Sequence, residues 1–169
     1  DLPSRFQDLP RPVRLFSCVA LGALGALSHE DLRVGILPIF TAVVIAMLIT
    51  PTRIRSAAWV GWLLGLGYFA TTLRWIVEPF LVDLARHGWM APFAIVFMAG
   101  GLALFWAAAF WLARWIAGSG PRVMLVLPVT LALAELARGH VLSGFPWGMV
   151  SYTLIGGVGD IWFAWIGPY

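Results

Sequence analysis

Residues 90–117 read MAPFAIVFMAGGLALFWAAAFWLARWIA, and the single charged side chain in this run is Arg114. An α-helix rises about 1.5 Å per residue, so about 20 apolar residues cross the roughly 30 Å hydrocarbon layer of a membrane. The run from Met90 to Ala117 exceeds that length. It predicts a transmembrane helix that is tilted or begins in the membrane interface.

Apolar segments continue on both sides of this run. The chain is 61% hydrophobic and 11% charged, whereas a soluble domain carries about 25% charged residues. Its surface must therefore face lipid, which excludes an ordinary water-soluble fold. We expect an all-α, polytopic membrane protein with about five transmembrane helices and a partial sixth, at Val13 to Ser28, Val34 to Thr50, Ala57 to Val77, Met90 to Ala117, Val123 to Leu142 and, in part, Ile155 to Ile166.

The distribution of arginines predicts the orientation, because cytoplasmic loops keep an excess of positive charge. If the N-terminus is inside, the inner side holds seven arginines and two carboxylates, and the outer side holds four arginines and six carboxylates. We therefore expect a cytoplasmic N-terminus, with the polar residues of interest at the outer face. The arginines lie in loops on both sides and form no single patch, so no nucleic-acid partner is expected.

Few residues in the chain can carry chemistry. All 11 basic residues are Arg, and the single cysteine, Cys18, lies in an apolar segment where we expect it to pack inertly. His29, His87 and His140 are scattered without metal-ligand spacing, so we expect no metal and no cofactor. The chain begins with Asp and stops directly after an apolar run, and we expect it to be part of a longer protein.

The loop after the third segment, residues 74–83, reads RWIVEPFLVD and mixes aromatic side chains with carboxylates. An ionisable group at membrane depth is costly, so it has a partner or a purpose. Glu78 lies four residues after Arg74 and can form an interfacial ion pair with it. Alternatively, Glu78 lines an entrance for lipid or substrate, with Trp75 beside it or in an aromatic belt.

A second cluster, residues 135–147, reads ELARGHVLSGFPW. Glu135 and Arg138 lie one helical turn apart, so they can form a structural ion pair in the interior of the bundle. The stretch from Gly144 to Trp147 cannot continue a helix, because Pro146 lacks an amide donor. A non-helical break between apolar segments must be buried in protein or line a wet cavity, which makes this stretch the best candidate for a substrate-facing element.

Small residues predict close helix packing. Gly61 and Gly65 form a GxxxG pattern, and Cys18, Gly22 and Ala26 form a similar row. Such patterns allow helix backbones to approach closely, and we interpret both as packing within the chain.

With these residues in view, the chain resembles the apolipoprotein N-acyltransferase family. Residues 74–83 resemble the loop after the third helix in alphaproteobacterial members, and Leu154 departs from the Gln that the family often has there. The stronger match is the family pattern of a Glu, an Arg-Gly, then Gly-Phe-Pro-Trp and a Tyr, found here as Glu135, Arg138-Gly139, Gly144 to Trp147 and Tyr152.

The resemblance implies an eight-helix membrane domain with a nitrilase-like domain on the periplasmic side. In that family a Glu-Lys-Cys triad in the soluble domain takes an acyl chain from a phospholipid and passes it to the diacylglyceryl-cysteine of an apolipoprotein. This chain has no Lys, so we assign it no catalytic residue. It corresponds to the N-terminal transmembrane domain, residues 1–169, of a bacterial inner-membrane enzyme whose substrate-binding residues here are Trp75, Glu78, Phe145, Trp147 and Tyr152.

Two alternatives from other classes stay open. Glu78, Glu135 and Arg138 could line the path of a transporter, although these charges gather at one face and none lies clearly at the midplane. The chain could also be a membrane anchor without catalysis of its own.

Overall fold

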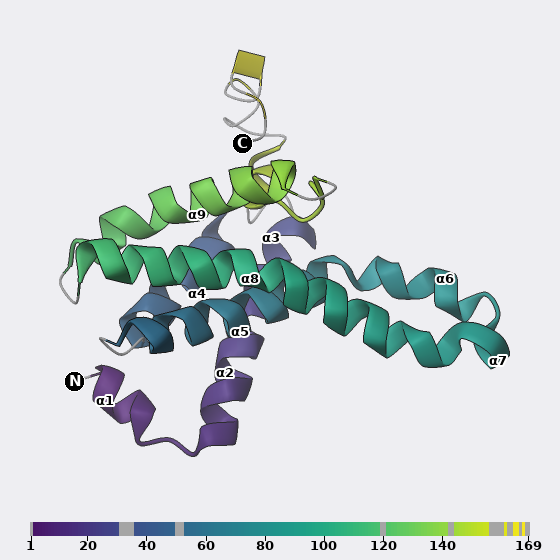
Figure 1. Ribbon diagram of the computed structural model, residues 1–169, viewed down its shortest axis with the longest axis horizontal. Coiled ribbons are helices and arrows are strands. Elements are labelled where there is room, and N and C mark those ends of the chain that lie inside the picture. Colours follow the sequence, from purple (N-terminus) through teal and green to yellow (C-terminus); the bar gives the residue numbers. More distant parts are fainter. Residues whose placement is uncertain are drawn as a thin grey trace.

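The computed structural model describes residues 2–30, 36–49, 53–118, 121–141, 144–155, 161, 164–165 and 167. Within these ranges the chain forms helices and turns and no strand, which confirms the predicted all-α class. Figure 1 shows the elements, which are α1 Leu2–Gln7, α2 Arg11–Gly25, α3 Leu27–Glu30, α4 Leu37–Ile49, α5 Ile54–Thr72, η1 Arg74–Val77, α6 Glu78–Leu81, α7 Leu84–His87, η2 Gly88–Met90, α8 Ala91–Ala117, α9 Val123–His140 and η3 Val150–Leu154.

Helix α5 is the centre of the bundle. It packs against α8 along its length and against α2 on another side, and α9 lies on α8 (Figure 1). Gly61 and Gly65 face α8: a Cβ at Gly61 would lie 2.7 Å from the carbonyl oxygen of Trp106, and one at Gly65 would lie 3.1 Å from the Cβ of Ala103. The GxxxG pair therefore brings two helices of the same chain together.

The contact between α2 and α5 is closer still. A Cβ at Gly22 would overlap the carbonyl oxygen of Leu64, and a Cβ at Gly67 would overlap the carbonyl oxygen of Val19. Each helix therefore contributes one glycine at the point where the other backbone passes. Cys18 is 2% exposed on the same face of α2, where it packs in the apolar core.

The helix ends follow from the sequence in most places. α8 begins one residue after the predicted start and ends at Ala117, before Gly118, which adopts a φ of 65°. α2 begins earlier than predicted, at Arg11, with a proline in its first turn, a position where the missing amide donor costs little. α9 ends at His140, and residues 142–143 lie outside the described residues.

The predicted helix from Ala57 to Val77 is wrong at its end. α5 stops at Thr72, and the segment that follows is bent by 63° from it. The hydroxyls of Thr71 and Thr72 donate to the carbonyl oxygens of Gly67 and Tyr68, at 2.9 and 2.8 Å. Such hydrogen bonds back to the preceding turn bend helices, and here the bend leads into η1.

The structure supports a membrane-spanning bundle. Among the described residues, three helical stretches are long and apolar enough to cross a membrane, or four if the bent pair counts as one span. α4 is shorter, with 13 residues, and the partial sixth helix expected at Ile155 to Ile166 falls largely outside the described residues. The count of five spans therefore stays a prediction.

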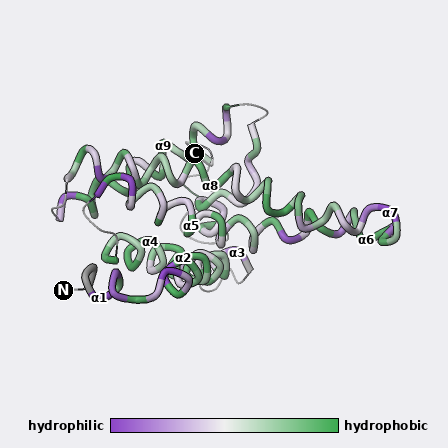
Figure 2. The backbone as a smooth tube through the Cα atoms, turned by 60° about the horizontal axis from the view of Figure 1, so that its bottom comes forward, coloured by the Kyte–Doolittle hydropathy of each residue, from purple (hydrophilic) through white to green (hydrophobic). Residues whose placement is uncertain are grey.

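The outer surface of the bundle is apolar. Figure 2 shows hydrophobic residues along the helices and hydrophilic residues near several helix ends. Large apolar side chains point away from the core on several helices, among them Phe16, Phe97 and Leu125, each 74–78% exposed. A surface of this kind suits lipid rather than water.

Candidate functional site

Glu135 and Arg138 form a buried ion pair at the C-terminal end of α9. Their Oε2 and Nη2 atoms lie 2.6 Å apart, and Arg138 is 1% exposed. The spacing of three residues places both side chains on one face of the helix. Each charge is therefore desolvated and depends on the other for compensation.

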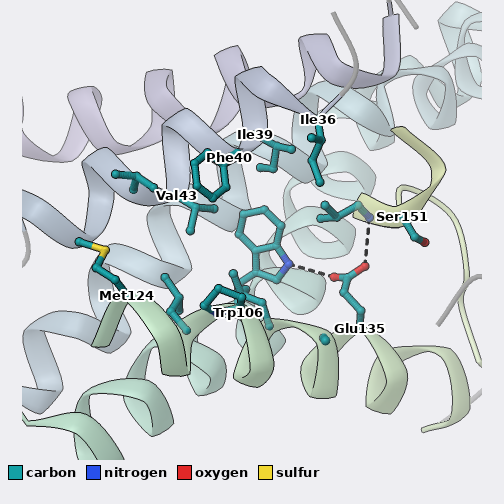
Figure 3. Close-up of a pocket in the computed structure, with 14 residues that line it drawn as sticks. Ile36, Ile39, Phe40, Val43, Trp106, Met124, Glu135 and Ser151 are labelled. Atoms are coloured by element: carbon teal, nitrogen blue, oxygen red, sulfur yellow. Dashed lines mark hydrogen bonds between the residues drawn. The ribbon is translucent and has the colours of Figure 1, made fainter. Parts of the chain in front are cut away.

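The Glu135 carboxylate accepts three hydrogen bonds from the residues that the structure describes. Its Oε1 accepts from the indole Nε1 of Trp106 at 3.0 Å, and its Oε2 accepts from Arg138 and from the backbone N–H of Val150 at 3.3 Å (Figure 3). The donors come from α8, α9 and η3. This engagement suits a structural anchor and leaves the carboxylate poorly placed to act as a general base.

Arg138 extends the cluster to the loop that follows α9. Its Nη1 donates to the carbonyl oxygens of Phe145 and Trp147, at 3.0 and 2.8 Å. Its guanidinium carbon also lies 5.1 Å from the centre of the Phe69 ring, within the range of a cation–π contact. One side chain thus joins α5, α9 and the loop.

The loop has the geometry that its sequence predicts. Gly144 and Gly148 adopt φ values of 64° and 69°, a region that favours glycine, and no helix forms between them. A Cβ at Gly148 would lie 3.2 Å from the Cγ2 of Thr72, so the loop packs tightly on the end of α5. Irregular backbone at a membrane needs internal hydrogen-bond donors, and Arg138 supplies two of them.

Two exposed tryptophans, one in this loop and one in η1, lie in contact. The rings of Trp75, in η1, and Trp147 lie 5.7 Å apart in an edge-to-face arrangement, and they are 44% and 56% exposed. The structure therefore brings together residues from the two sequence clusters. We name this contact the tryptophan rim.

The remaining predicted site residues are not part of the tryptophan rim. Phe145 is partly buried and packs against the core, while Glu78 is exposed at the start of α6. Tyr152 is partly buried in η3. In the part of the chain that the structure describes, neither Glu78 nor the side chain of Tyr152 shares a hydrogen bond or ring contact with the tryptophan rim.

An apolar cavity of about 420 Å³ lies beside Glu135, which forms part of its wall (Figure 3). Its size is within the range of ligand pockets, about 300–1,000 Å³. Glu135 and Ser151 supply polar groups to its walls, and the rest is lined mainly by aliphatic and aromatic side chains of α4, α8 and α9, including Ile39, Phe40, Val43, Trp106, Met124 and Leu127. Such walls can hold hydrocarbon.

The sequence did not predict the aromatic residues that contact Glu135 and its hydrogen-bond partner Trp106. Tyr68 of α5 stacks on Trp106 with ring centres 4.8 Å apart, and its hydroxyl hydrogen-bonds to Nε2 of His29 at 2.5 Å. The sequence places Trp106 in an apolar run, where packing is the default interpretation, and no local pattern links it to Glu135. Among the described residues, no three His, Cys, Asp or Glu side chains gather as a metal site would require.

Comparisons with known proteins show which proteins this chain is similar to. A family model described as the apolipoprotein N-acyltransferase N-terminal domain matches residues 21–169. The apolipoprotein N-acyltransferase of Caulobacter vibrioides is 49% identical over 100 residues, which cover 59% of this chain and 19% of that protein. The protein of the same name from Rhodopseudomonas palustris is 43% identical over 101 residues, covering 60% and 19%.

A longer match is found in Allorhizobium ampelinum. Its apolipoprotein N-acyltransferase is 29% identical over 149 residues, which cover 82% of this chain and 28% of that protein. The chain therefore matches less than a third of the length of each of these relatives.

Proposed function

The chain belongs to the apolipoprotein N-acyltransferase family, and we propose that residues 1–169 are the N-terminal transmembrane domain of a longer N-acyltransferase. The complete enzyme moves an acyl chain from a phospholipid to the N-terminal diacylglyceryl-cysteine of a bacterial apolipoprotein. Its catalytic residues lie in a nitrilase-like domain outside this chain. The protein resides in the bacterial inner membrane with its N-terminus in the cytoplasm, as the distribution of arginines favours.

The observation that supports the proposal is the tryptophan rim, whose Trp147 lies in a loop held by the buried pair of Arg138 and Glu135. Both substrates are diacylated lipids, so their tails must stay in hydrocarbon while the reacting groups meet at the water boundary. An exposed aromatic pair suits that boundary, because indole rings favour the membrane interface. Trp75 and Trp147 guide a lipid toward the catalytic domain, with Glu78, Phe145 and Tyr152 around them, and Arg138 holds the loop that carries Trp147.

The family match favours this function over a transporter path. The geometry also favours it, because Glu135 and Arg138 bond to each other and to the loop. A transported ion needs ligands that can be released to it.

The test compares two exposed tryptophans in the full-length enzyme. Trp147→Ala removes one ring of the tryptophan rim. The control, Trp111→Ala, removes one ring of the stacked pair Trp111 and Trp115, which lies near the C-terminal end of α8. We expect acyl transfer from phospholipid to a diacylated lipopeptide to fall roughly tenfold or more in the first variant, because misplaced substrate reacts slowly. The second variant should retain activity.

The same assay decides against the proposal if the rim is dispensable. Unchanged turnover of both acyl donor and acceptor in Trp147→Ala and in Glu78→Gln would remove these residues from the site.

A further inference from the structure

A second cavity is lined by residues of α1, α2 and α5, at the end of the bundle opposite to the tryptophan rim. It has a volume of about 470 Å³. Arg11 and Arg14 line one part of it, and Leu15, Cys18, Val60 and Leu63 line the apolar part, with Trp59 and Trp62 beside them. We call it the arginine cavity. Its walls combine positive charge with hydrocarbon contact, a combination that the tryptophan rim lacks.

Among the described residues, no carboxylate forms an ion pair with the arginines of this cavity. Nη1 of Arg14 donates to Oε1 of Gln7 at 2.5 Å, which orients the guanidinium. Nε of Arg14 is buried without a hydrogen-bond partner in the described part of the chain. Neither Arg11 nor Arg14 forms an ion pair among the residues that the structure describes. The cavity therefore contains donors suited to an anion.

The start of α2 adds to this preference. The helix begins at Arg11, its cap residue Pro10 makes no side-chain hydrogen bond, and its first turn holds no acidic residue. The first amides of a helix lack partners within the helix and carry partial positive charge, so they favour an anion. Pro12 has no amide hydrogen, and the N–H of Arg14 donates to the carbonyl oxygen of Pro10 at 3.1 Å, so in this turn the amides of Arg11 and Val13 can add to the two arginines.

Further arginines lie on the helix ends near this end of the bundle. Figure 1 shows α1, the start of α5 and the start of α9 at the same end of the bundle. Arg53 and Arg55 stand at the start of α5, and Arg122 precedes α9, each exposed. Their field attracts negative charge from the adjoining membrane surface.

We propose that the arginine cavity binds one anionic phospholipid from the leaflet that faces this end of the bundle. The lipid phosphate contacts the guanidinium groups of Arg11 and Arg14 and the backbone N–H groups of Arg11 and Val13. One acyl chain lies along the apolar wall between α2 and α5, against Leu15 and Val60. A phospholipid fits better than a soluble anion, because most of the lining is apolar.

This site differs from the proposed lipid route of the acyl-transfer reaction. Its walls come from α1, α2 and α5, whereas the tryptophan rim is formed by η1 and the loop after α9, and no residue is shared between them. The proposal therefore does not depend on the enzymatic function, and a failure of one leaves the other standing.

Native mass spectrometry of the full-length protein tests the site directly. The protein, released from detergent, is titrated with phosphatidylglycerol or with phosphatidylcholine of the same acyl composition, and a third titration uses inorganic phosphate. We expect phosphatidylglycerol to bind preferentially. The double variant Arg11→Gln and Arg14→Gln should bind it roughly 30-fold more weakly, since each basic residue near a membrane surface contributes about a factor of five.

The matched control is the double variant Arg55→Gln and Arg122→Gln. It removes the same charge from the same end of the bundle, but neither residue lines the cavity. Preference for phosphatidylglycerol that is lost in the cavity variant and kept in the control supports the proposal, provided that both variants keep the parent's thermal midpoint in neutral detergent.

Three results would overturn the proposal. Equal loss in both variants would indicate a diffuse charge effect. Equal binding of the two lipids would remove the role of the anionic headgroup. Competition by inorganic phosphate as effective as the lipid itself would show that the apolar wall contributes nothing. Where the cavity variant unfolds, the single change Leu15→Gln, on the apolar wall, must weaken lipid binding or the proposal fails.

Discussion

The two ends of the bundle use arginine in different ways. At one end Arg138 is 1% exposed, pairs with Glu135 and donates to two backbone carbonyls. At the other end Arg14 is half-buried, and its protein hydrogen bond goes to the neutral side chain of Gln7. A charge that is compensated within the protein supports the fold, whereas a charge in an open cavity is available to a ligand. The comparison predicts opposite responses to the same kind of substitution.

The largest expected loss of stability comes from removing Arg138, whose charge is compensated within the protein. Arg138→Met leaves the Glu135 carboxylate buried without its counter-ion and releases the carbonyls of Phe145 and Trp147. Removing one partner of a buried pair costs about 3–5 kcal/mol. The free energy of unfolding, measured in mixed micelles with SDS as denaturant, should fall by that amount.

A second change at Glu135 provides the control. The double variant Glu135→Gln and Arg138→Met removes both charges, so it should unfold at a higher SDS concentration than Arg138→Met alone. If the double variant is the less stable of the two, the ion pair is not the source of the effect.

A smaller effect is expected from the hydrogen bond between α8 and α9. Trp106→Phe keeps an aromatic ring against Tyr68 but removes the indole donor to Glu135. A hydrogen bond to a charged group contributes about 1.5–3 kcal/mol. We expect a loss of stability in that range by the same SDS titration. No change would mean that Glu135 finds another donor at no cost.

The packing between the two ends should respond to added volume. Gly22→Ala places a methyl group on the carbonyl of Leu64, whereas Gly101→Ala meets no neighbouring atom within 4 Å. Forced overpacking costs about 1–3 kcal/mol, and we expect that loss only at Gly22. Equal thermal midpoints for the two variants would contradict the close contact of α2 with α5.

The smallest effect on stability is expected at the arginine cavity. Arg14→Gln removes a charge that no carboxylate compensates in the described part of the chain. Substitutions away from buried networks stay within about 0.5 kcal/mol. Unfolding in neutral micelles should therefore be unchanged. A loss as large as that of Arg138→Met would eliminate the distinction between the two ends.

Local pattern predicted much of this architecture and part of the site. Composition identified the apolar helices, and the spacing of Glu135 and Arg138 placed them on one face of α9. Pro146 indicated the non-helical stretch from Gly144 to Trp147. These features depend on residues close in sequence, where periodicity and backbone geometry decide the outcome.

Contacts between distant segments could not be predicted in this way. Trp106 lies 29 residues before Glu135, and no periodicity links an indole on one helix to a carboxylate on another. The end of α5 at Thr72 was missed because the apolar run continues past it, and the hydroxyl bonds of Thr71 and Thr72 that accompany the bend leave no periodic signal. The arginine cavity is likewise lined by residues of α1, α2 and α5 together, an arrangement that only the tertiary structure shows.

The most direct test of the account asks whether Arg138 positions the tryptophan rim. Trp75→Cys and Trp147→Cys are introduced together in the full-length protein, and a short thiol-to-thiol crosslinker is applied in membranes. The crosslinked peptides are then quantified by mass spectrometry, with and without Arg138→Met. We predict an efficient crosslink that is largely lost when Arg138 is replaced. No crosslink in the parent, or an equal yield in both, would contradict the account.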